Sequence, residues 1–489
     1  MNSYRLKLGL LLACHLLFTV NCSGFLLQGE AREANRTVPS RYGHSQGAAK
    51  TNAQAGVAAQ KHWDAIFFNR DLKALIYAAL KNNQELNIRI QEIIIAKSEL
   101  SSRRGEYLPK VNAVAGSGIE KVGKHTSQGV SDETHGVSEN LADFNFGLAA
   151  SWELDVWGKL RNAAQAADYR YLASIEAKNF LVTELIAEIA NSYYDLVALD
   201  NQLEVVSRNI KIQENALEVV KLKQQAARAT MLAVQKFEAE VLKNQGRKFA
   251  LEQERVQIEN RINFLVGRYP QPIARTANTF MDKKPVAIAT GIPSQLLENR
   301  PDVRQAILEL EAAKLDVQVA KARFLPRLSL EAGVGYESFN AKHLVATPAS
   351  LIYNLAGNLV APLLNVAAIK ADYRSANARQ IQAVINFERT LLKAFTEVSN
   401  QLAKIDNYEK RYDRVSKQVK TLEDAIEMSN VLYQSARADY MEVLMTRRDA
   451  LEAEVDLIET KKQQMQAMVG VYQALGGGWQ RKAKTKKAM

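Results

Sequence analysis

The chain has 489 residues, of which 47% are hydrophobic and 24% charged, and its formal net charge is +11. This composition excludes an intrinsically disordered chain, and the length allows two or three ordinary domains. The positive charge does not indicate nucleic acid, because Lys and Arg are spread along predicted helices and interleave with Glu, as on solvated helix faces. Basic residues cluster in a tail at 479–489, and we predict no nucleic-acid partner.

The N-terminus reads MNSYRLKLGLLLACHLLFTVNCSG, a basic start followed by an apolar run too short to span a membrane. We predict a signal peptide at 1–21. The only two cysteines are Cys14 and Cys22, so an exported mature chain has no disulfide framework. Cys22 follows the apolar run at the place where lipoproteins are cleaved and acylated, and we predict lipidation there. Asn21 departs from the small residue usual before such a cysteine, which leaves Cys14 acylation and plain cleavage as alternatives.

The mature chain begins with a linker and a helical segment. Residues 22–60 are rich in Gly, Ala, Ser, Asn and Gln without an apolar period, so they predict an extended linker, lipid-anchored if Cys22 is acylated. A helical pattern then runs from 63 to 106. It stops before Pro109, because proline disfavours helix in the residue before it.

Two strands follow this helix. Apolar residues alternate with polar or small ones, which predicts strands at about 110–122 and 143–155, joined by a polar loop at 123–140. The apolar positions of the second strand include Phe144, Phe146, Leu148 and Trp152.

A long helical run is predicted at about 158–266, without an internal proline. Its large apolar residues step by three and four, the spacing of a coiled-coil seam. They are Leu196, Leu199, Leu203, Val206 and Ile210. The seam loses its large residues near QAARA at 225–229, where we predict that the run folds back into a hairpin. We expect arms of roughly 55–65 residues, or about 80–100 Å at 1.5 Å per residue.

The second half of the chain repeats this order. After a linker at 271–290, the sequence predicts a helix from 301 to 324. The later elements are strands at about 327–338 and 351–361 and a helical hairpin at about 363–475. Pro326 follows Pro109 by 217 residues, and QSARA follows QAARA by 209. We therefore predict two internal repeats, at 61–270 and 291–478.

The four strands predict a membrane sheet shared between copies. Each has about 10 residues, the length that crosses a bilayer when tilted. Backbone groups in lipid must all be paired, so the sheet must close, and the smallest closed barrels have about 8 strands. Two copies would supply 8 strands and three copies 12. The aromatic residues predicted to face lipid and its interfaces are Phe144, Phe146, Trp152, Tyr336 and Tyr353. The alternative is a soluble sheet.

Several segments resemble the TolC-like outer-membrane factors, the exit channels of tripartite efflux pumps. The similarity is greatest to the lipoprotein branch that serves resistance-nodulation-division pumps. The segments that carry it are WDAIFFNRDLKALIYAALKNNQEL (63–86), SWELDVWGKLRNA (151–163), LLENRPDVRQA (296–306), YQSARADYMEVLMTRRDALEAE (433–454) and ALGGGW (474–479). SWELDVWGKLR and LLENRPDVRQA are specific, whereas ALGGGW alone is weak.

The resemblance implies a mainly helical homotrimer with a 12-stranded membrane β-barrel and a coiled-coil α-barrel of 12 helices reaching into the periplasm. It implies passive conduction of small solutes, no cofactor and no enzymatic activity. The implied partners are outer-membrane lipid, a periplasmic adaptor and an inner-membrane transporter. QAARA and QSARA then become turns at the periplasmic tip. The family usually has glycine in these turns, where this chain has Ala227 and Ala436.

The predicted site is the aperture at this tip. The family usually has an acidic residue six positions after the turn glycine, which Glu442 keeps and Ala233 does not. We predict that Glu442, with Asp439 nearby, forms an acidic ring that favours cations, and that Arg228 and Arg437 hold the tip shut. The alternative for each is an ordinary solvated helix residue.

Three other functions are alternatives. The nearest is the duct of a type I protein secretion system, which has the same fold. A soluble basic coiled-coil protein conflicts with the signal peptide and the strands. An enzyme or metal site is disfavoured, because no cluster of His, Cys or carboxylate residues occurs in the sequence.

Overall fold

The computed structural model describes residues 32–40, 42, 62–276, 280–283, 293–364, 366–435 and 437–479. The predicted signal peptide, Cys14, Cys22, Ala436 and most of the basic tail lie outside these residues. Contacts divide the chain into two compact units. The first contains the strands, with 111–162 and 313–385, and the second contains most of the helical residues, with 35–110, 163–312 and 386–479.

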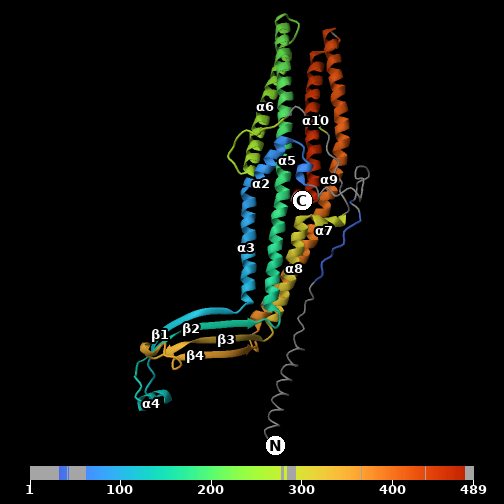
Figure 1. Cartoon of the computed structure of the whole chain (residues 1–489). Coiled ribbons are helices and arrows are strands. Elements are labelled where there is room, and N and C mark those ends of the chain that lie inside the picture. Colours follow the sequence, from blue (N-terminus) through green and yellow to red (C-terminus); the bar gives the residue numbers. More distant parts are fainter. Residues whose placement is uncertain are drawn as a thin grey trace, which may run out of the picture. The chain divides into compact units, whose positions relative to one another are not determined.

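The first unit contains an antiparallel sheet of four strands in the order β1-β2-β3-β4 (Figure 1). The strands are β1 (Lys110–Glu120), β2 (Leu141–Leu154), β3 (Arg327–Ser338) and β4 (Leu351–Val360). They lie within two residues of the predicted bounds at each end. Because β2 and β3 are neighbours, the sheet joins strands from the two halves of the sequence.

The register places the large apolar residues of neighbouring strands on one face. Phe146 pairs with Tyr336, and Trp152 with Leu330, while Val334 pairs with Tyr353. Side chains alternate between faces along a strand, so the residues between these positions occupy the opposite face. The Cβ of Gly116 would lie 2.9 Å from Asn145 Oδ1, which places the even-numbered residues of β1 on that opposite face.

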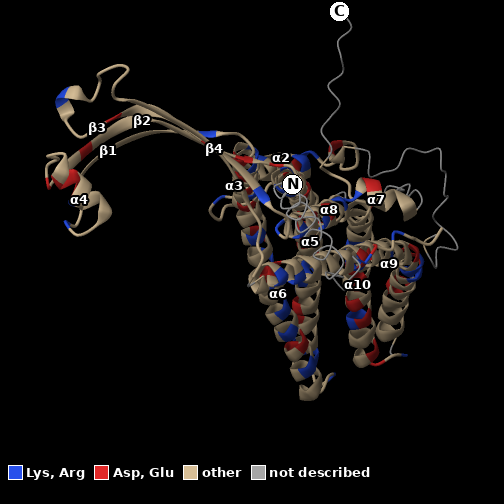
Figure 2. Ribbon diagram, turned by 90° about the horizontal axis from the view of Figure 1, so that it is seen from below, with Lys and Arg blue, Asp and Glu red and all other residues tan. Residues whose placement is uncertain are grey.

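Every charged residue of the four strands lies on this second face. The residues are Lys110, Glu120, Asp143, Glu153, Arg327, Glu331 and Glu337. The first face carries no charge and is called here the apolar face, and the other is called the polar face. In Figure 2 the strands are mostly tan, the colour of residues other than Lys, Arg, Asp and Glu, whereas blue and red residues are interspersed along the helices.

Glycines allow a close approach of β2 and β3 on the polar face. Gly147 and Gly335 are paired across the two strands. A Cβ on Gly147 would lie 2.5 Å from the Val334 carbonyl oxygen, and one on Gly335 would lie 2.5 Å from that of Phe146. Backbone atoms cannot move aside as a flexible side chain can, so neither position accepts a larger residue without shifting a strand.

The connection between β1 and β2 differs from the prediction. The segment 123–140 was expected to be a polar loop throughout, but it contains the helix α4 (Ser127–Thr134). The Thr126 hydroxyl accepts a hydrogen bond from Gly129 N at 3.1 Å, which is an N-cap. The cap and the local sequence are sufficient for two helical turns despite the low apolar content.

The second half of each predicted repeat is a pair of long helices joined by a short turn. The first pair is α5 (Lys159–Gln225) and α6 (Met231–Val266), and the second is α9 (Ala367–Gln434) and α10 (Tyr440–Ala474). Figure 1 shows α6 beside the later part of α5 and α10 beside the later part of α9. The predicted arms of similar length were wrong: α5 has 67 residues and α6 has 36, because the turn lies well past the middle of the run.

The coiled-coil seam of α5 is confirmed as a packed stripe. All five of its predicted apolar positions are buried, and Val206 and Ile210 pack with Leu451 of α10. Among the described residues, no helix has an apolar stretch that could span a bilayer.

The helical pattern predicted from 63 to 106 is not one helix. It consists of η2 (Trp63–Ala65), α2 (Arg70–Asn82) and α3 (Gln84–Glu106), with a break at Asn83. Trp63 and Ile76 lie in the largest core of the second unit with Tyr193 of α5, Ile262 of α6 and Tyr472 of α10. The break allows α2 to bury its apolar face in this core.

The corresponding segment of the second half also breaks. It consists of η3 (Pro293–Gln295), α7 (Leu296–Asn299) and α8 (Pro301–Ala322), separated at Arg300. A last short 3-10 helix, η4 (Ala341–His343), lies between β3 and β4. Pro109 and Pro326 each lie directly before a strand, as predicted.

Candidate functional site

The turn between α5 and α6 is closed by backbone hydrogen bonds. Ala227 N donates to Gln224 O at 2.9 Å, and Arg228 N donates to Lys223 O at 2.7 Å. Ala227 has φ of +57°, in the left-handed region that favours glycine. The Thr230 hydroxyl then accepts from Ala233 N at 3.2 Å and caps α6. This turn therefore keeps the backbone shape of a glycine turn at the expense of some strain.

The turn between α9 and α10 closes in the same way. Arg437 N donates to Leu432 O at 2.9 Å. Asp439 occupies the N-cap position of α10 without a side-chain cap bond, and Glu442 lies in the first turn of that helix. Two carboxylates at a helix N-terminus are favourably placed, because the helix dipole is positive there.

The four predicted aperture residues are Arg228, Arg437, Asp439 and Glu442, and all are exposed. Within the described part of the protomer, their side chains form no ion pair or hydrogen bond with one another or with other residues. Ala233, which has the place of Glu442 in the first turn, is fully buried in a cluster with Phe237 and Leu444. Only one of the two turns thus presents carboxylates to its surroundings.

Contacts between the two hairpins near these turns were not predicted from the sequence. Lys223 Nζ donates to the Tyr433 hydroxyl at 2.9 Å and lies 4.3 Å from the centre of that ring. Farther along the helices, Arg208 of α5 pairs with Glu454 of α10 at 2.7 Å. No local sequence pattern predicts either pair, because the two partners are more than 200 residues apart in the sequence.

The five aromatic residues predicted to face lipid all lie on the apolar face of the sheet. Phe146 and Tyr336 stack with their ring centres 5.4 Å apart. The Tyr336 hydroxyl also lies 2.9 Å from Thr347 Oγ1. The aromatic rings thus belong to one continuous apolar surface.

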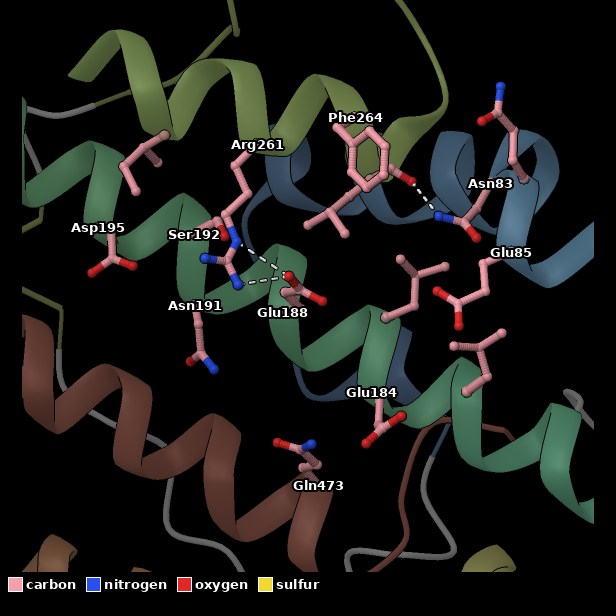
Figure 3. A pocket seen from close by; sticks show the side chains of 15 residues that line it. Asn83, Glu85, Glu184, Glu188, Asn191, Ser192, Asp195, Arg261, Phe264 and Gln473 are labelled. Carbon is pink, nitrogen blue, oxygen red and sulfur yellow. Dashed lines mark hydrogen bonds and ion pairs between the residues drawn. The ribbon is translucent and has the colours of Figure 1, made fainter. Parts of the chain in front are cut away.

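A pocket of about 460 Å³ lies in the second unit, between α3, α5, α6 and α10 (Figure 3). Arg261 binds Glu188 through two hydrogen bonds of 2.7 and 3.1 Å to one carboxylate oxygen. Asn83 donates to Leu265 O at 2.9 Å. Glu184 has a raised pKa, chiefly because of burial, with the nearby carboxylates adding and Lys393 opposing.

The lining of this pocket contains no nucleophile beside a base. Its lining includes no His or Cys, and its serine, Ser192, has no adjacent base among the lining residues. Among the residues that the structure describes, no group of three or more His, Cys, Asp or Glu side chains is placed to hold a metal.

The chain resembles known proteins over most of its length. The family model of the outer membrane efflux protein matches residues 75–268 and 292–477. The chain is 29% identical to the pyoverdine export outer membrane protein OpmQ of Pseudomonas aeruginosa, over 86% of this chain and 88% of that protein. It is 27% identical to the cation efflux system protein CusC of Escherichia coli O6:H1, with the same coverage.

Solved structures share the fold. The open state of the Neisseria gonorrhoeae MtrE outer membrane channel superposes with a TM-score of 0.80 at 23% identity, covering 92% of this chain and 98% of that one. The match includes both the strands and the long helices, since it spans nearly all of both chains.

Proposed function

Because this chain belongs to the outer membrane efflux protein family, we propose that it is the outer-membrane exit channel of a tripartite efflux pump. In this proposal the channel is a homotrimer that conducts small solutes passively. An inner-membrane transporter drives export, and a periplasmic adaptor joins the transporter to the channel.

One observation carries the membrane assignment: all charged residues of the sheet lie on one face. A charge facing lipid is most expensive near the middle of the bilayer, about 2–4 kcal/mol for Lys or Arg. The apolar face instead presents large hydrophobic side chains, such as Tyr353 and Leu355, which are 83% and 77% exposed in the protomer. A water-soluble sheet would be expected to cover such a face with a helix.

The sheet order supports a shared barrel. The sheet ends at β1 and β4, so each protomer has two edges in need of partners. Within lipid such edges cannot remain open. Three copies placed edge to edge give 12 strands and close the sheet, and each β4 then pairs with β1 of the next copy.

The long helices support a tunnel. α5 has 67 residues and would extend about 100 Å at 1.5 Å per residue. The exposed tip residues Arg228, Arg437, Asp439 and Glu442 are available to sister subunits or to an adaptor. We propose that the carboxylates of Asp439 and Glu442 line the aperture and that the two arginines help to keep it closed.

The N-terminal segment supports a lipid anchor at Cys22. Arg32 O accepts a hydrogen bond from Gln380 Nε2 at 3.0 Å, and α9 begins 13 residues before Gln380. That interval is about 20 Å of helix. Ten residues separate Cys22 from Arg32, and an extended chain of that length reaches at most about 36 Å. An acyl chain on Cys22 could therefore reach the level at which α9 follows β4.

The relatives favour small solutes over proteins as cargo. One is named for pyoverdine export and another for cation efflux. We therefore favour an efflux pump over a type I protein secretion system and assign no enzymatic step to this chain.

Adjacent residues of β4 provide a test. Leu355 lies on the apolar face and Asn354 on the polar face, and both are exposed. We expect Leu355→Lys to abolish recovery of the exported protein in outer-membrane fractions as a particle of three copies. Asn354→Lys, the matched control, should assemble normally. Mass would be measured in detergent by light scattering.

Two results would contradict the proposal. One is a purified full-length protein that stays monomeric without detergent. The other is equal tolerance of Lys at positions 354 and 355, because a lipid-facing residue cannot accept a charge as easily as its water-facing neighbour.

A further inference from the structure

The middle of the polar face is lined by small or uncharged side chains. On β2 these are Gly147, Ala149 and Ser151, and in the same rows on β4 they are Ile352, Asn354 and Ala356. On β3 the same stretch contains Gly333 and Gly335. Glu331 is the exception, since it is the one charged residue in the middle rows of this face.

Glu331 projects from this wall without a neighbour that could cover it. Its cross-strand partners are Ser151 on β2 and Ala356 on β4. The residues two positions away on the same face of β3 are Ser329 and Gly333. All four are too short to shield a carboxylate, and Glu331 is exposed.

The cations of the strands do not neutralise Glu331. Lys110 and Arg327 are the first residues of β1 and β3. Arg327 pairs with Glu153 at 3.6 Å, and Lys159 binds the same carboxylate. Within the described residues, Glu331 has no ion pair.

We propose that Glu331 determines the charge selectivity of the barrel, so that the barrel passes cations and neutral solutes more readily than anions. This inference rests on the proposed function, because it requires the polar face to line the lumen of a closed barrel. Three copies then place three carboxylates at one height around a wall of small side chains. Rings of acidic side chains favour cations in pores, and walls of low dielectric constant strengthen the field within them.

The experiment measures ion selectivity of the purified full-length protein in planar lipid bilayers under a KCl gradient. We expect the wild-type reversal potential to have the sign of cation preference. Glu331→Gln, which keeps the size of the side chain, should bring it to about half or less of the wild-type value, and Glu331→Lys should move it further in the anion direction. Glu298→Gln, a change on an exposed residue of the short helix α7, outside the strands and the long helices, should leave it unchanged.

The aperture could instead set the selectivity, and a further variant separates the two. If Glu442→Gln shifts the reversal potential and Glu331→Gln does not, the proposal for Glu331 is wrong. An unchanged potential in Glu331→Gln overturns it as well.

Thiol labelling distinguishes this failure from failure of the proposed function. Native cysteines occur only at positions 14 and 22, so a single added cysteine is readily followed. In a membrane-embedded barrel, a water-soluble thiol reagent should modify Glu331→Cys but not Leu330→Cys, the neighbouring position on the apolar face. The reverse pattern would overturn the barrel itself. The expected pattern with unaltered ion selectivity would overturn only the role of Glu331.

Discussion

At two helix junctions of the second unit, a side chain donates a hydrogen bond to a carbonyl near the end of a long helix, but the side chains differ. At the first, α2 gives way to α3 at Asn83, whose Nδ2 donates to Leu265 O near the end of α6 at 2.9 Å. At the second, α7 gives way to α8 at Arg300, whose Nη1 donates to Ala474 O near the end of α10 at 2.7 Å. Asn83 and Arg300 are 217 residues apart, and the two carbonyls are 209 residues apart, the same separations as the echoes in the sequence.

Each junction also uses a glycine just after the long helix. Gly267 and Gly476 have φ of +76° and +79°. A Cβ on the first would lie 2.5 Å from Asn82 O, and one on the second 2.6 Å from Asn299 O. The carbonyls at a helix C-terminus lack partners within the helix. At each junction a side-chain donor satisfies one of these carbonyls, and the glycine lets the backbone of the junction approach the helix end.

The difference lies in how the next helix begins. Asn83 can accept as well as donate, and its Oδ1 caps α3 by accepting from Leu86 N at 2.9 Å. The Arg300 guanidinium has no acceptor and cannot cap α8. This helix begins with Pro301, which lacks an N–H, and the Asp302 carboxylate accepts from Val303 N at 2.9 Å. The Asn83 side chain thus fills both roles, as donor to the long helix and as cap of the next helix, which Arg300, Pro301 and Asp302 share at the second junction.

Replacing Arg300 should lower the free energy of unfolding more than any other change at the two junctions. Its side chain is almost fully buried, and it binds Glu397 at 2.8 Å and Asp302 at 2.6 Å. Arg300→Met would leave the Ala474 carbonyl without its donor and Asp302 without its ion-pair partner, while Glu397 would keep only Lys393 at 3.7 Å. We expect a loss of about 3–5 kcal/mol in unfolding free energy, as for a broken buried ion pair, measured by urea unfolding in detergent.

The matched control for this variant is Arg411→Met. Arg411 pairs with Asp456 at 2.6 Å, but both side chains are substantially exposed. Its loss should cost less than about 1 kcal/mol. Equal effects of the two variants would mean that burial does not distinguish the Arg300 junction from a surface ion pair.

Replacing either glycine should cost less than replacing Arg300, and the two glycines should behave alike. Gly267→Ala and Gly476→Ala each combine a left-handed backbone with a contact to a carbonyl oxygen, so we expect a loss of about 1–3 kcal/mol apiece. Gly246→Ala is the control, since that glycine lies within α6 with open space around it. It should be neutral or stabilise by about 0.5–1 kcal/mol, and a neutral Gly267→Ala would refute the shared geometry.

The sequence predicts the elements of this fold better than the contacts that join them. Strand alternation and the α5 seam have a fixed period, and the prolines before β1 and β3 act on their immediate neighbours, so the sequence reveals all of them. Asn83 and Arg300 act on carbonyls 182 and 174 residues away, and no period connects such positions. The same reason hides the bond between Lys223 and Tyr433.

The candidate site divides in the same way. The aromatic residues of the apolar face follow from alternation, which is why Phe144 and Tyr353 could be placed from sequence. The roles of Arg228, Arg437, Asp439 and Glu442 stay predictions, because they concern neighbouring copies or partners. Cys22 lies outside the described residues.

Asn83→Ala should have a smaller effect than Arg300→Met. It removes a helix cap, worth about 1 kcal/mol, and leaves the Leu265 carbonyl without its donor, at a cost of about 1–3 kcal/mol. Asn69→Ala is the matched control, because Asn69 caps α2 through Leu72 N at 3.0 Å. In thermal unfolding followed by the helical circular dichroism signal, the midpoint of Asn83→Ala should be clearly lower than that of Asn69→Ala. Equal midpoints would show that the Leu265 contact adds nothing.

The smallest effect on stability is expected at Glu184, whose pKa is influenced by carboxylates of both junctions. Burial is the main cause that raises the pKa of Glu184, and Asp302 of the second junction and Glu85 of the first also raise it, while Lys393 lowers it. A carboxyl whose pKa is higher in the folded state binds its proton more tightly there, so folding loses stability as the pH rises above the ordinary carboxyl range.

Glu184→Gln should therefore raise the unfolding midpoint at neutral pH, on the order of one degree, since the group is only partly buried. The gain should vanish below the ordinary carboxyl pKa, where both side chains are neutral. Midpoints measured across this pH range would test the sign. A variant that loses stability at neutral pH would mean that the charged carboxylate is favoured in the folded state, so that Lys393 outweighs burial and the acidic residues at both junctions.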